Sequence, residues 1–296
     1  MSAYRGRFAP SPTGRLHFGS LTAALGSWLF ARAAGGRWIV RMEDLDPPRE
    51  VAGADADILR TLSAFGLESD EAVAYQSRRG DAYAQAFAQL KDGGHVYECW
   101  CSRSDLASLD GIHPVECIAA RDATRAPAWR VRAPSRVIEF DDAIQARVRQ
   151  DIARDAGDFV VLRADGWTAY QLAVVVDDAA QGITDVVRGA DLIDSTPRQI
   201  LLQELLGLPR VRYAHLPLAL DREGRKLSKH ERSLAVDDAD PLPALRAGLA
   251  FLGQPIPSAT TVEAVLAEAL RHFDPNRIPQ NAGTPHPFAA MREELS

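Results

Sequence analysis

The chain has 296 residues, enough for about two domains that each bury a core. Its composition, 46% hydrophobic and 25% charged, is typical of a globular protein, and no apolar run approaches the roughly 20 residues that span a bilayer, so we expect a cytoplasmic protein without a membrane partner. The net charge of −6 argues against a protein that binds nucleic acid over its whole surface, and three cysteines without a secretion signal argue against a disulfide framework.

The first third of the chain alternates between strand and helix patterns. Strands are predicted at residues 6–9 and 38–42, and helices at residues 19–34, 55–65 and 81–91. Such an alternation indicates an α/β fold with a parallel sheet and helices on both faces.

The pattern breaks between about residues 97 and 134, where short pieces rich in cysteine and arginine predict an insertion. It resumes with a predicted strand at 159–163. Residues 170–176 are the most apolar run and predict a central strand. A strand end at 186–189 and a helix at 196–206 follow.

These changes divide the chain into four segments. Residues 1–96 and 159–225 are predicted to be the two halves of a Rossmann-type parallel sheet domain, and residues 97–158 an insertion between them. Residues 226–296 are predicted to form a loop and a short helical C-terminal region. The expected fold class is therefore α/β with a small inserted subdomain.

The segment Ala9–Ser20 combines a strand end, a loop with glycine and prolines, and a helix start. In open α/β sheets, a helix N-terminus in this position binds phosphate through its backbone N–H groups. His17 could donate a hydrogen bond to a phosphate, or it could simply cap the helix. Farther along, Lys226 and Lys229 are two of only three lysines in the chain. They could supply positive charge to a polyphosphate, or lie on an exposed basic loop.

The two segments resemble the HIGH and KMSKS signatures of the class I aminoacyl-tRNA synthetases, since His17–Ser20 reads HFGS and Lys226–His230 reads KLSKH. Members of this class bind ATP with Mg²⁺ and join an amino acid to AMP. No general base is needed, because the attacking carboxylate is already ionised. The resemblance implies His17 and Lys229 as catalytic groups. It implies an ATP site made by His17, Gly19, Ser20, Lys226, Ser228 and Lys229.

Four longer motifs resemble the glutamyl-tRNA synthetase branch of the class. They are Arg7–Gly14, Arg41–Asp44, Tyr170–Asp178 and Thr184–Gln199, and the resemblance extends over about residues 5–235. It implies a pocket for L-glutamate. The residues implied are Arg7, Ala9, Ser11, Glu43, Tyr170 and Arg188.

Within this pocket, the resemblance implies that Arg7 and Arg188 pair with carboxylate groups, Arg188 with the side-chain carboxylate. Glu43 would bind the α-ammonium group, and Ser11 and Tyr170 would add hydroxyl contacts. The chemistry agrees, because a guanidinium group suits bidentate recognition of carboxylate. The alternative is that each arginine forms an ordinary ion pair with a neighbouring aspartate.

Only about 65 residues follow the second signature, too few for the helical anticodon-binding module of a full-length glutamyl-tRNA synthetase. This shortened form resembles the glutamyl-queuosine tRNA(Asp) synthetases. The resemblance implies transfer of activated glutamate to queuosine at the wobble position, with the anticodon stem-loop of tRNA(Asp) as partner. We also expect the protein to be a monomer. Two alternatives are a truncated enzyme that charges tRNA(Glu) and a catalytically silent RNA-binding paralogue.

Five arginines between Arg121 and Arg136 could grip the RNA backbone, or they could form a solvated surface.

The insertion contains a candidate metal site. Cys99-x-Cys101 and His113-x3-Cys117 offer three thiolates and one imidazole, a donor set typical of a closed, structural Zn²⁺ site. The spacing resembles a zinc site of the same synthetase family, in which the third ligand is often tyrosine. The alternative is three reduced cysteines beside an unrelated histidine.

Overall fold

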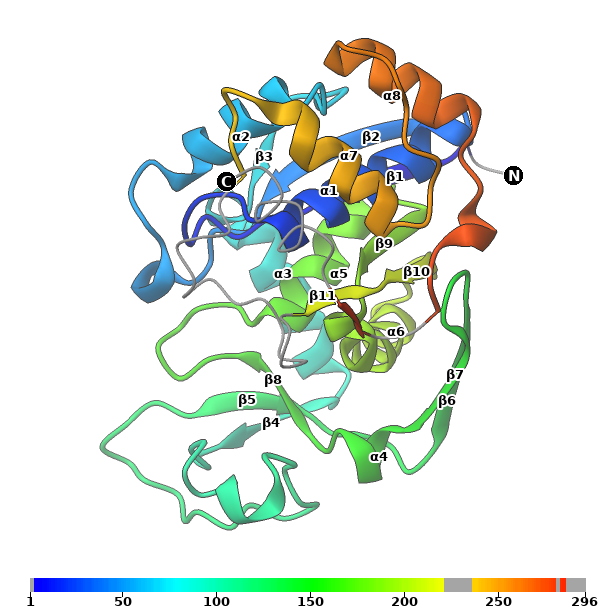
Figure 1. Cartoon of the computed structure of the whole chain (residues 1–296). Coiled ribbons are helices and arrows are strands. Elements are labelled where there is room, and N and C mark those ends of the chain that lie inside the picture. Colours follow the sequence, from blue (N-terminus) through cyan, green and yellow to red (C-terminus); the bar gives the residue numbers. More distant parts are fainter. Residues whose placement is uncertain (1–2, 221–235, 281–282, 286–296) are drawn as a thin grey trace.

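The main sheet carries the site and has a doubly wound order. The structure is a computed structural model that describes residues 3–220, 236–280 and 283–285. Within these residues the main sheet has seven strands in the order β3-β2-β1-β9-β10-β6-β7, parallel except for the β6–β7 hairpin (Figure 1). The strands are β1 (Arg5–Phe8), β2 (Arg37–Met42), β3 (Ala74–Tyr75), β6 (Val137–Asp142), β7 (Ala146–Asp151), β9 (Asp185–Gly189) and β10 (Arg212–Leu216).

Helices cover both faces of this sheet. They are α1 (Phe18–Ala33), α2 (Ala54–Ala64), α3 (Gly80–Asp92), α4 (Ile152–Asp155), α5 (Tyr170–Ala180), α6 (Thr196–Leu205), α7 (Pro241–Phe251) and α8 (Val262–Arg271). Short 3₁₀ turns lie at Pro47–Arg49, Gln76–Arg78, Ala107–Leu109, Ala190–Ser195 and Pro275–Arg277.

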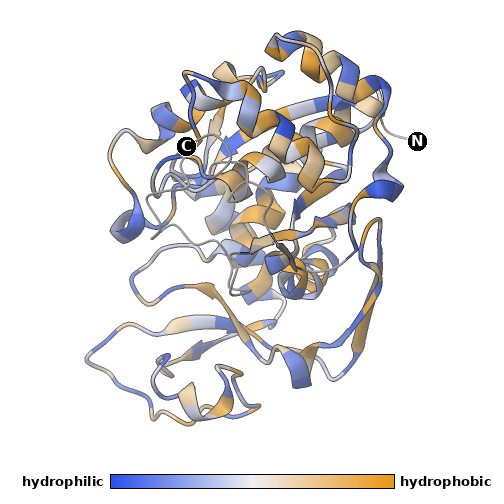
Figure 2. Cartoon of the chain, viewed as in Figure 1, coloured by the Kyte–Doolittle hydropathy of each residue, from blue (hydrophilic) through white to orange (hydrophobic). Residues whose placement is uncertain are grey.

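Side-chain alternation along β2 separates two hydrophobic cores. Trp38 and Val40 pack in a core with α1, α2, α7 and α8, whereas Ile39 packs in a second core with α3, α5 and α6. Successive strand residues point to opposite faces, so one strand supplies both cores. Hydrophobic residues accordingly concentrate in the central elements in Figure 2, while the outer helices alternate between hydrophobic and hydrophilic faces.

The predicted elements of the first third are confirmed to within two residues at each end, and so are the helix at 196–206 and the strand end at 186–189. The helical C-terminal region is present as α7 and α8. Among the described residues, no helix has the length and apolar character needed to cross a bilayer.

The prediction of a central strand at residues 170–176 is wrong, because these residues begin helix α5. Helix α5 packs between α3, α6 and the sheet, and four consecutive residues, Leu172–Val175, are buried. A helix buried on most sides has a continuous apolar sequence, which periodicity alone cannot distinguish from a buried strand. The helix places positions 170, 177 and 178 along one side.

The expectation that residues 159–163 rejoin the parallel sheet is also wrong. Strand β8 (Phe159–Leu162) pairs instead with β5 (Ala128–Val131), which pairs with β4 (Val96–Cys99) in a separate antiparallel sheet below the main one in Figure 1. Conversely, β6 and β7, from the predicted insertion, join the main sheet beside β10. Two further strands, β11 (Leu218–Leu220) and β12 (Gly283–Pro285), pair in parallel.

Candidate active site

A cavity of about 630 Å³ lies at the carboxyl ends of β1, β9 and β10. Strands β1 and β9 are neighbours, and the chain continues from them to opposite sides, to β2 and to β10. This is the switch point at which open α/β sheets bind ligands. All six residues of the expected glutamate pocket line this cavity. They are Arg7, Ala9, Ser11, Glu43, Tyr170 and Arg188.

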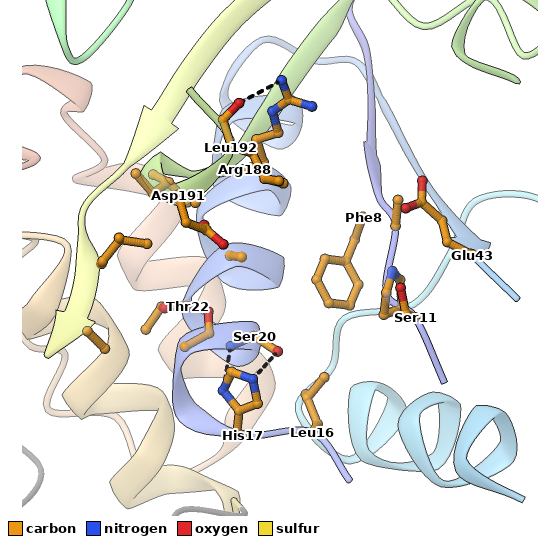
Figure 3. Close-up of a pocket in the computed structure, with 18 of the residues that line it drawn as sticks. Phe8, Ser11, Leu16, His17, Ser20, Thr22, Glu43, Arg188, Asp191 and Leu192 are labelled. Atoms are coloured by element: carbon orange, nitrogen blue, oxygen red, sulfur yellow. Dashed lines mark hydrogen bonds between the residues drawn. The ribbon is translucent and has the colours of Figure 1, made fainter. Parts of the chain in front are cut away.

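The N-terminus of α1 forms one end of the cavity. His17 caps the helix, since its Nδ1 accepts a hydrogen bond from the Ser20 backbone N–H at 3.3 Å, and its Nε2 lies 3.0 Å from the Ser20 hydroxyl. His17, Gly19 and Ser20 all line the cavity, and Figure 3 shows His17 at the opposite end of the view from Arg188. The positive end of the helix dipole and the backbone N–H groups at the start of α1 favour an anion here.

Close packing holds α1 against the sheet. A methyl group added at Gly26 would lie 2.6 Å from Leu216 Cδ1, which is closer than real side chains approach. Glycine at this position therefore allows α1 to pass close to Leu216 at the end of β10, and so helps to set the place of the helix N-terminus.

Arg188 forms the other end of the cavity and is buried. Its Nε donates to His215 Nε2 at 3.2 Å, Nη1 donates to the Tyr170 hydroxyl at 3.3 Å, and Nη2 donates to Thr196 Oγ1 at 2.8 Å and to the Leu192 carbonyl at 3.3 Å. A guanidinium has five N–H groups, so one on Nη1 has no partner among the described residues.

Arg188 differs from the other arginines that line the cavity. Arg7 Nε lies 3.0 Å from an Asp178 carboxylate oxygen, and Arg15 lies 3.6 Å from Asp57. Within the described part of the chain, no carboxylate oxygen lies within 4.0 Å of Arg188. A buried cation without an anionic partner is costly, so this end of the cavity favours an anionic ligand.

The ion-pair alternative therefore describes Arg7 in this structure. Its Nε and Nη2 contact Asp178 at 3.0 and 3.3 Å, and its role toward a glutamate carboxylate stays a prediction.

A buried network of charges holds Glu43. Arg41, fully buried, contacts Asp178 at 2.9 Å, Gln181 at 2.7 Å and Glu43 at 3.2 Å. Burial acts to raise the pKa of Asp178, but the guanidinium groups of Arg7 and Arg41 outweigh it and lower this pKa. Burial raises the pKa of Glu43, and Arg41 and Arg7 oppose that rise. Arg41 therefore both orients Glu43 and helps to keep it ionised.

Replacing Arg41 by methionine should lower the free energy of unfolding by about 3–5 kcal/mol, because it leaves the buried Glu43 carboxylate without its guanidinium partner and removes one of the two guanidinium groups that contact Asp178. Urea denaturation of the purified protein measures this change. The matched control is Arg60→Met, which removes an exposed guanidinium that pairs with Asp57 and Asp238. It should change the urea midpoint very little. Equal effects of the two substitutions would contradict a stabilising role for the network.

The second expected phosphate segment cannot be placed, since Lys226, Ser228 and Lys229 lie outside the described residues. Their expected roles stay predictions.

The four candidate metal ligands come together. Cys99, Cys101, His113 and Cys117 place their ligand atoms within 4.8 Å of one another. The His113 Nδ1 lies 2.6 Å from the Pro114 carbonyl, to which only a protonated nitrogen can donate, and Nε2 faces the Cys99 sulfur at 3.2 Å. A metal-binding histidine uses this arrangement, because its second nitrogen is usually held by a carbonyl or carboxylate.

The pKa values of the cluster also bear on metal binding. Burial and the neighbouring cysteines raise the pKa of Cys117 to about 12. Burial and the Arg130 charge lower the pKa of His113. A bound Zn²⁺ would offset the charge of the thiolates, and the three sulfurs and one nitrogen would form its closed tetrahedral shell. Such an ion would be structural, because the set leaves no position open for a substrate.

One of the five arginines between 121 and 136 is not on the surface. Arg130 is buried and donates from Nε to Cys99 Sγ at 3.3 Å. The other four are exposed, and two of them form ion pairs, Arg125 with Asp122 and Arg136 with Glu204. We conclude that Arg130 belongs to the cysteine cluster, and only the exposed members remain candidates for RNA contact.

Sequence reasoning missed the residues that hold the site in place. Arg41, Asp142, Asp178 and His215 are all buried, and none of them received a role. The available signal was a charged or titratable residue within or directly after an apolar run, because such a residue needs a partner when buried.

Comparisons with known proteins show the family of the chain. The family model described as tRNA synthetases class I (E and Q), catalytic domain, matches residues 3–264. The chain is 59% identical over 281 residues to a protein of Xanthomonas oryzae pv. oryzae named Glutamyl-Q tRNA(Asp) synthetase, covering 94% of this chain and 93% of that protein. It is 52% identical over 283 residues to a protein of the same name from Pseudomonas syringae pv. tomato, covering 94% and 95%.

Among solved structures, the chain resembles a glutamate tRNA ligase from Elizabethkingia meningosepticum in complex with its amino acid. The TM-score is 0.80 at 26% identity, and the match covers all of this chain and 70% of that one. The expected α/β fold class is thereby confirmed.

Proposed function

The chain belongs to the family of class I tRNA synthetases for glutamate and glutamine and is a ligase-type enzyme; from this premise, we propose that it activates L-glutamate with ATP and transfers it to queuosine at the wobble position of tRNA(Asp). In this proposal the amino-acid substrate is L-glutamate, the nucleotide is ATP with Mg²⁺, and the RNA partner is the anticodon stem-loop that carries queuosine.

One observation carries the choice of an acidic amino acid. Arg188 is a buried cation without a carboxylate partner among the described residues, and it shares a cavity with Glu43, an oriented carboxylate. A zwitterion with an extra side-chain carboxylate complements this pair, since its ammonium group meets Glu43 and its side chain meets Arg188.

Activation then needs only positioning. The α-carboxylate oxygen of glutamate attacks the α-phosphorus of ATP, a new P–O bond forms, and the bond to pyrophosphate breaks. His17 and the N–H groups at the start of α1 would stabilise the charge that develops on the α-phosphate. Lys229 would neutralise the leaving pyrophosphate. In the transfer step, a hydroxyl of the queuosine cyclopentene-diol attacks the glutamyl carbonyl and AMP leaves.

The choice of queuosine rests on the relatives. The two proteins named Glutamyl-Q tRNA(Asp) synthetase described above share 59% and 52% identity with the chain and are matched over 93% and 95% of their own lengths. The glutamate tRNA ligase is matched over 70% of its length at 26% identity. We therefore favour the anticodon over the acceptor end as the site of transfer.

The test is to incubate the protein with labelled glutamate, ATP and unfractionated tRNA, and then to map the labelled nucleotide. We expect label at the wobble position of tRNA(Asp). Removal of the 3′-terminal adenosine from the tRNA should leave the labelling unchanged, and tRNA without queuosine should remain unlabelled. Label on the 3′ end would favour the tRNA(Glu)-charging alternative, and a lack of glutamate-dependent ATP–pyrophosphate exchange would favour the silent paralogue.

A further inference from the structure

We propose that Asp142 and His215 are a positioning pair that holds the Arg188 guanidinium in place by fixing His215 as a neutral ring protonated on Nδ1. This inference rests on the proposed function, because it explains how Arg188 is held rigidly in the position where it would bind the side-chain carboxylate of glutamate. Neither residue lines the cavity.

The pair is buried between strands of the main sheet. Asp142 ends β6 and His215 lies on β10, and the side chains of both are 0% exposed. Asp142 Oδ2 lies 2.6 Å from His215 Nδ1. Asp142 Oδ1 accepts backbone hydrogen bonds from Ile144 at 3.0 Å, Gln145 at 2.8 Å and His215 at 3.1 Å. One carboxylate oxygen is therefore occupied by the backbone, and the other is dedicated to the imidazole.

This arrangement determines the tautomer of His215. An ionised carboxylate only accepts hydrogen bonds, so Nδ1 must carry the proton. Burial and the Arg188 charge lower the pKa of His215, although Asp142 opposes this, so the ring is neutral and its Nε2 is an acceptor. Arg188 Nε, 3.2 Å away, can only donate, and the contact is satisfied by this tautomer alone.

The contact fixes the plane of the guanidinium. Arg188 is also held on Nη2 by Thr196 and lies over the Tyr213 ring, with Cζ 5.7 Å from the ring centre. Tyr213 in turn stacks on His215, with ring centres 6.1 Å apart and planes 12° apart. The remaining Nη1 N–H is then preoriented for the ligand, which lowers the entropic cost of binding.

Asp142→Asn tests the tautomer directly. Three backbone N–H groups require the amide oxygen at the Oδ1 position, so the amide NH₂ must face His215 Nδ1. The ring then carries its proton on Nε2, so two N–H donors face each other and the hydrogen bond from Arg188 Nε is lost. We expect the KM for glutamate in ATP–pyrophosphate exchange to rise about 10- to 100-fold, the range for loss of a hydrogen bond to a charged group. The KM for ATP should stay close to that of the wild type.

The matched control is Asp185→Asn, which alters a buried aspartate on the same strand as Arg188 that pairs with Arg212, outside the cavity. Its KM for glutamate should be unchanged. If Asp142→Asn does not fold, His215→Gln and His215→Leu replace it. Both lose the Asp142 contact, but glutamine retains an acceptor for Arg188, so its KM for glutamate should be lower than that of the leucine variant.

Nitrogen NMR of the wild-type imidazoles provides a readout that does not depend on catalysis. We expect His215 to be protonated on Nδ1 only, and a ring protonated on Nε2 would overturn the inference. A wild-type KM in Asp142→Asn, or equal KM values for the two His215 variants, would overturn the inference and leave the proposed function intact. A wild-type protein without glutamate-dependent exchange would remove both.

Discussion

Replacing Arg188 by alanine is expected to raise the KM for glutamate in ATP–pyrophosphate exchange by about 10²–10³-fold. Arg188 is the only one of the three arginines lining the cavity that has no carboxylate within 4.0 Å among the described residues. Its charge is thus available to the ligand. Truncating one partner of a buried, hydrogen-bonded charge pair costs about 2–5 kcal/mol, and the expected loss of affinity, about 3–4 kcal/mol, lies within this range.

The free energy of unfolding of the Arg188 variant should change less than its free energy of glutamate binding. The reason is that Arg188 has no carboxylate partner among the described residues, so the substitution leaves no buried anion unpaired. Thermal unfolding without ligand checks this expectation. Arg212→Ala is the matched control, since Arg212 lies on the neighbouring strand β10 and pairs with Asp185 outside the cavity. An Arg188 variant with an unchanged KM for glutamate would refute the assignment of the side-chain carboxylate to this residue.

Removing the metal is expected to unfold the cysteine-containing part of the insertion. The apolar core around the cluster is small, with Cys99, Cys101 and Leu106 as its buried members and Tyr97 and Ala119 packed against them. A core of this size cannot hold a loop-rich segment, so metal binding would supply its folding energy. We expect about one zinc per chain in the wild type, as a Cys₃His set binds a single ion.

Cys117→Ser should weaken zinc retention by at least about 100-fold, because it removes one of the four ligands. Elemental analysis after dialysis against a chelator measures retention, and limited proteolysis between residues 100 and 127 measures local unfolding. His95→Ala is the matched control, since His95 is a histidine of the same region outside the cluster. A wild-type protein without zinc, or a Cys117 variant as resistant to protease as the wild type, would contradict a structural metal.

The cluster of three cysteines and one histidine, and the helix-capping histidine, could be predicted because each depends on short spacing along the chain. Cys99 and Cys101 are two residues apart, and His17 caps the helix that begins at the next residue. Local geometry brings such groups together in most folds, so the sequence pattern is sufficient.

The buried pairs that hold Glu43 and Arg188 in place could not be predicted in this way. Arg41 and Asp178 are 137 residues apart, and Asp142 and His215 are 73 residues apart. Their contacts depend on the order of the strands and on which helix packs over them. The assignment of residues 170–176 to a strand concealed one of these contacts, because only the helical form turns Asp178 toward Arg7 and Arg41.

The sequence by itself predicted the kind of chemistry, through a histidine at a helix start, two lysines in an expected loop, and arginines with a glutamate at strand ends. Only the tertiary structure decided which arginine is available to a ligand. Arg7 and Arg188 are both buried in strands of the same sheet. Arg7 forms an ion pair with Asp178, which is 171 residues away in the sequence. No carboxylate among the described residues contacts Arg188. The physical reason is that charges pair strongly only within a few ångströms, and distances of that kind between remote residues are set by packing.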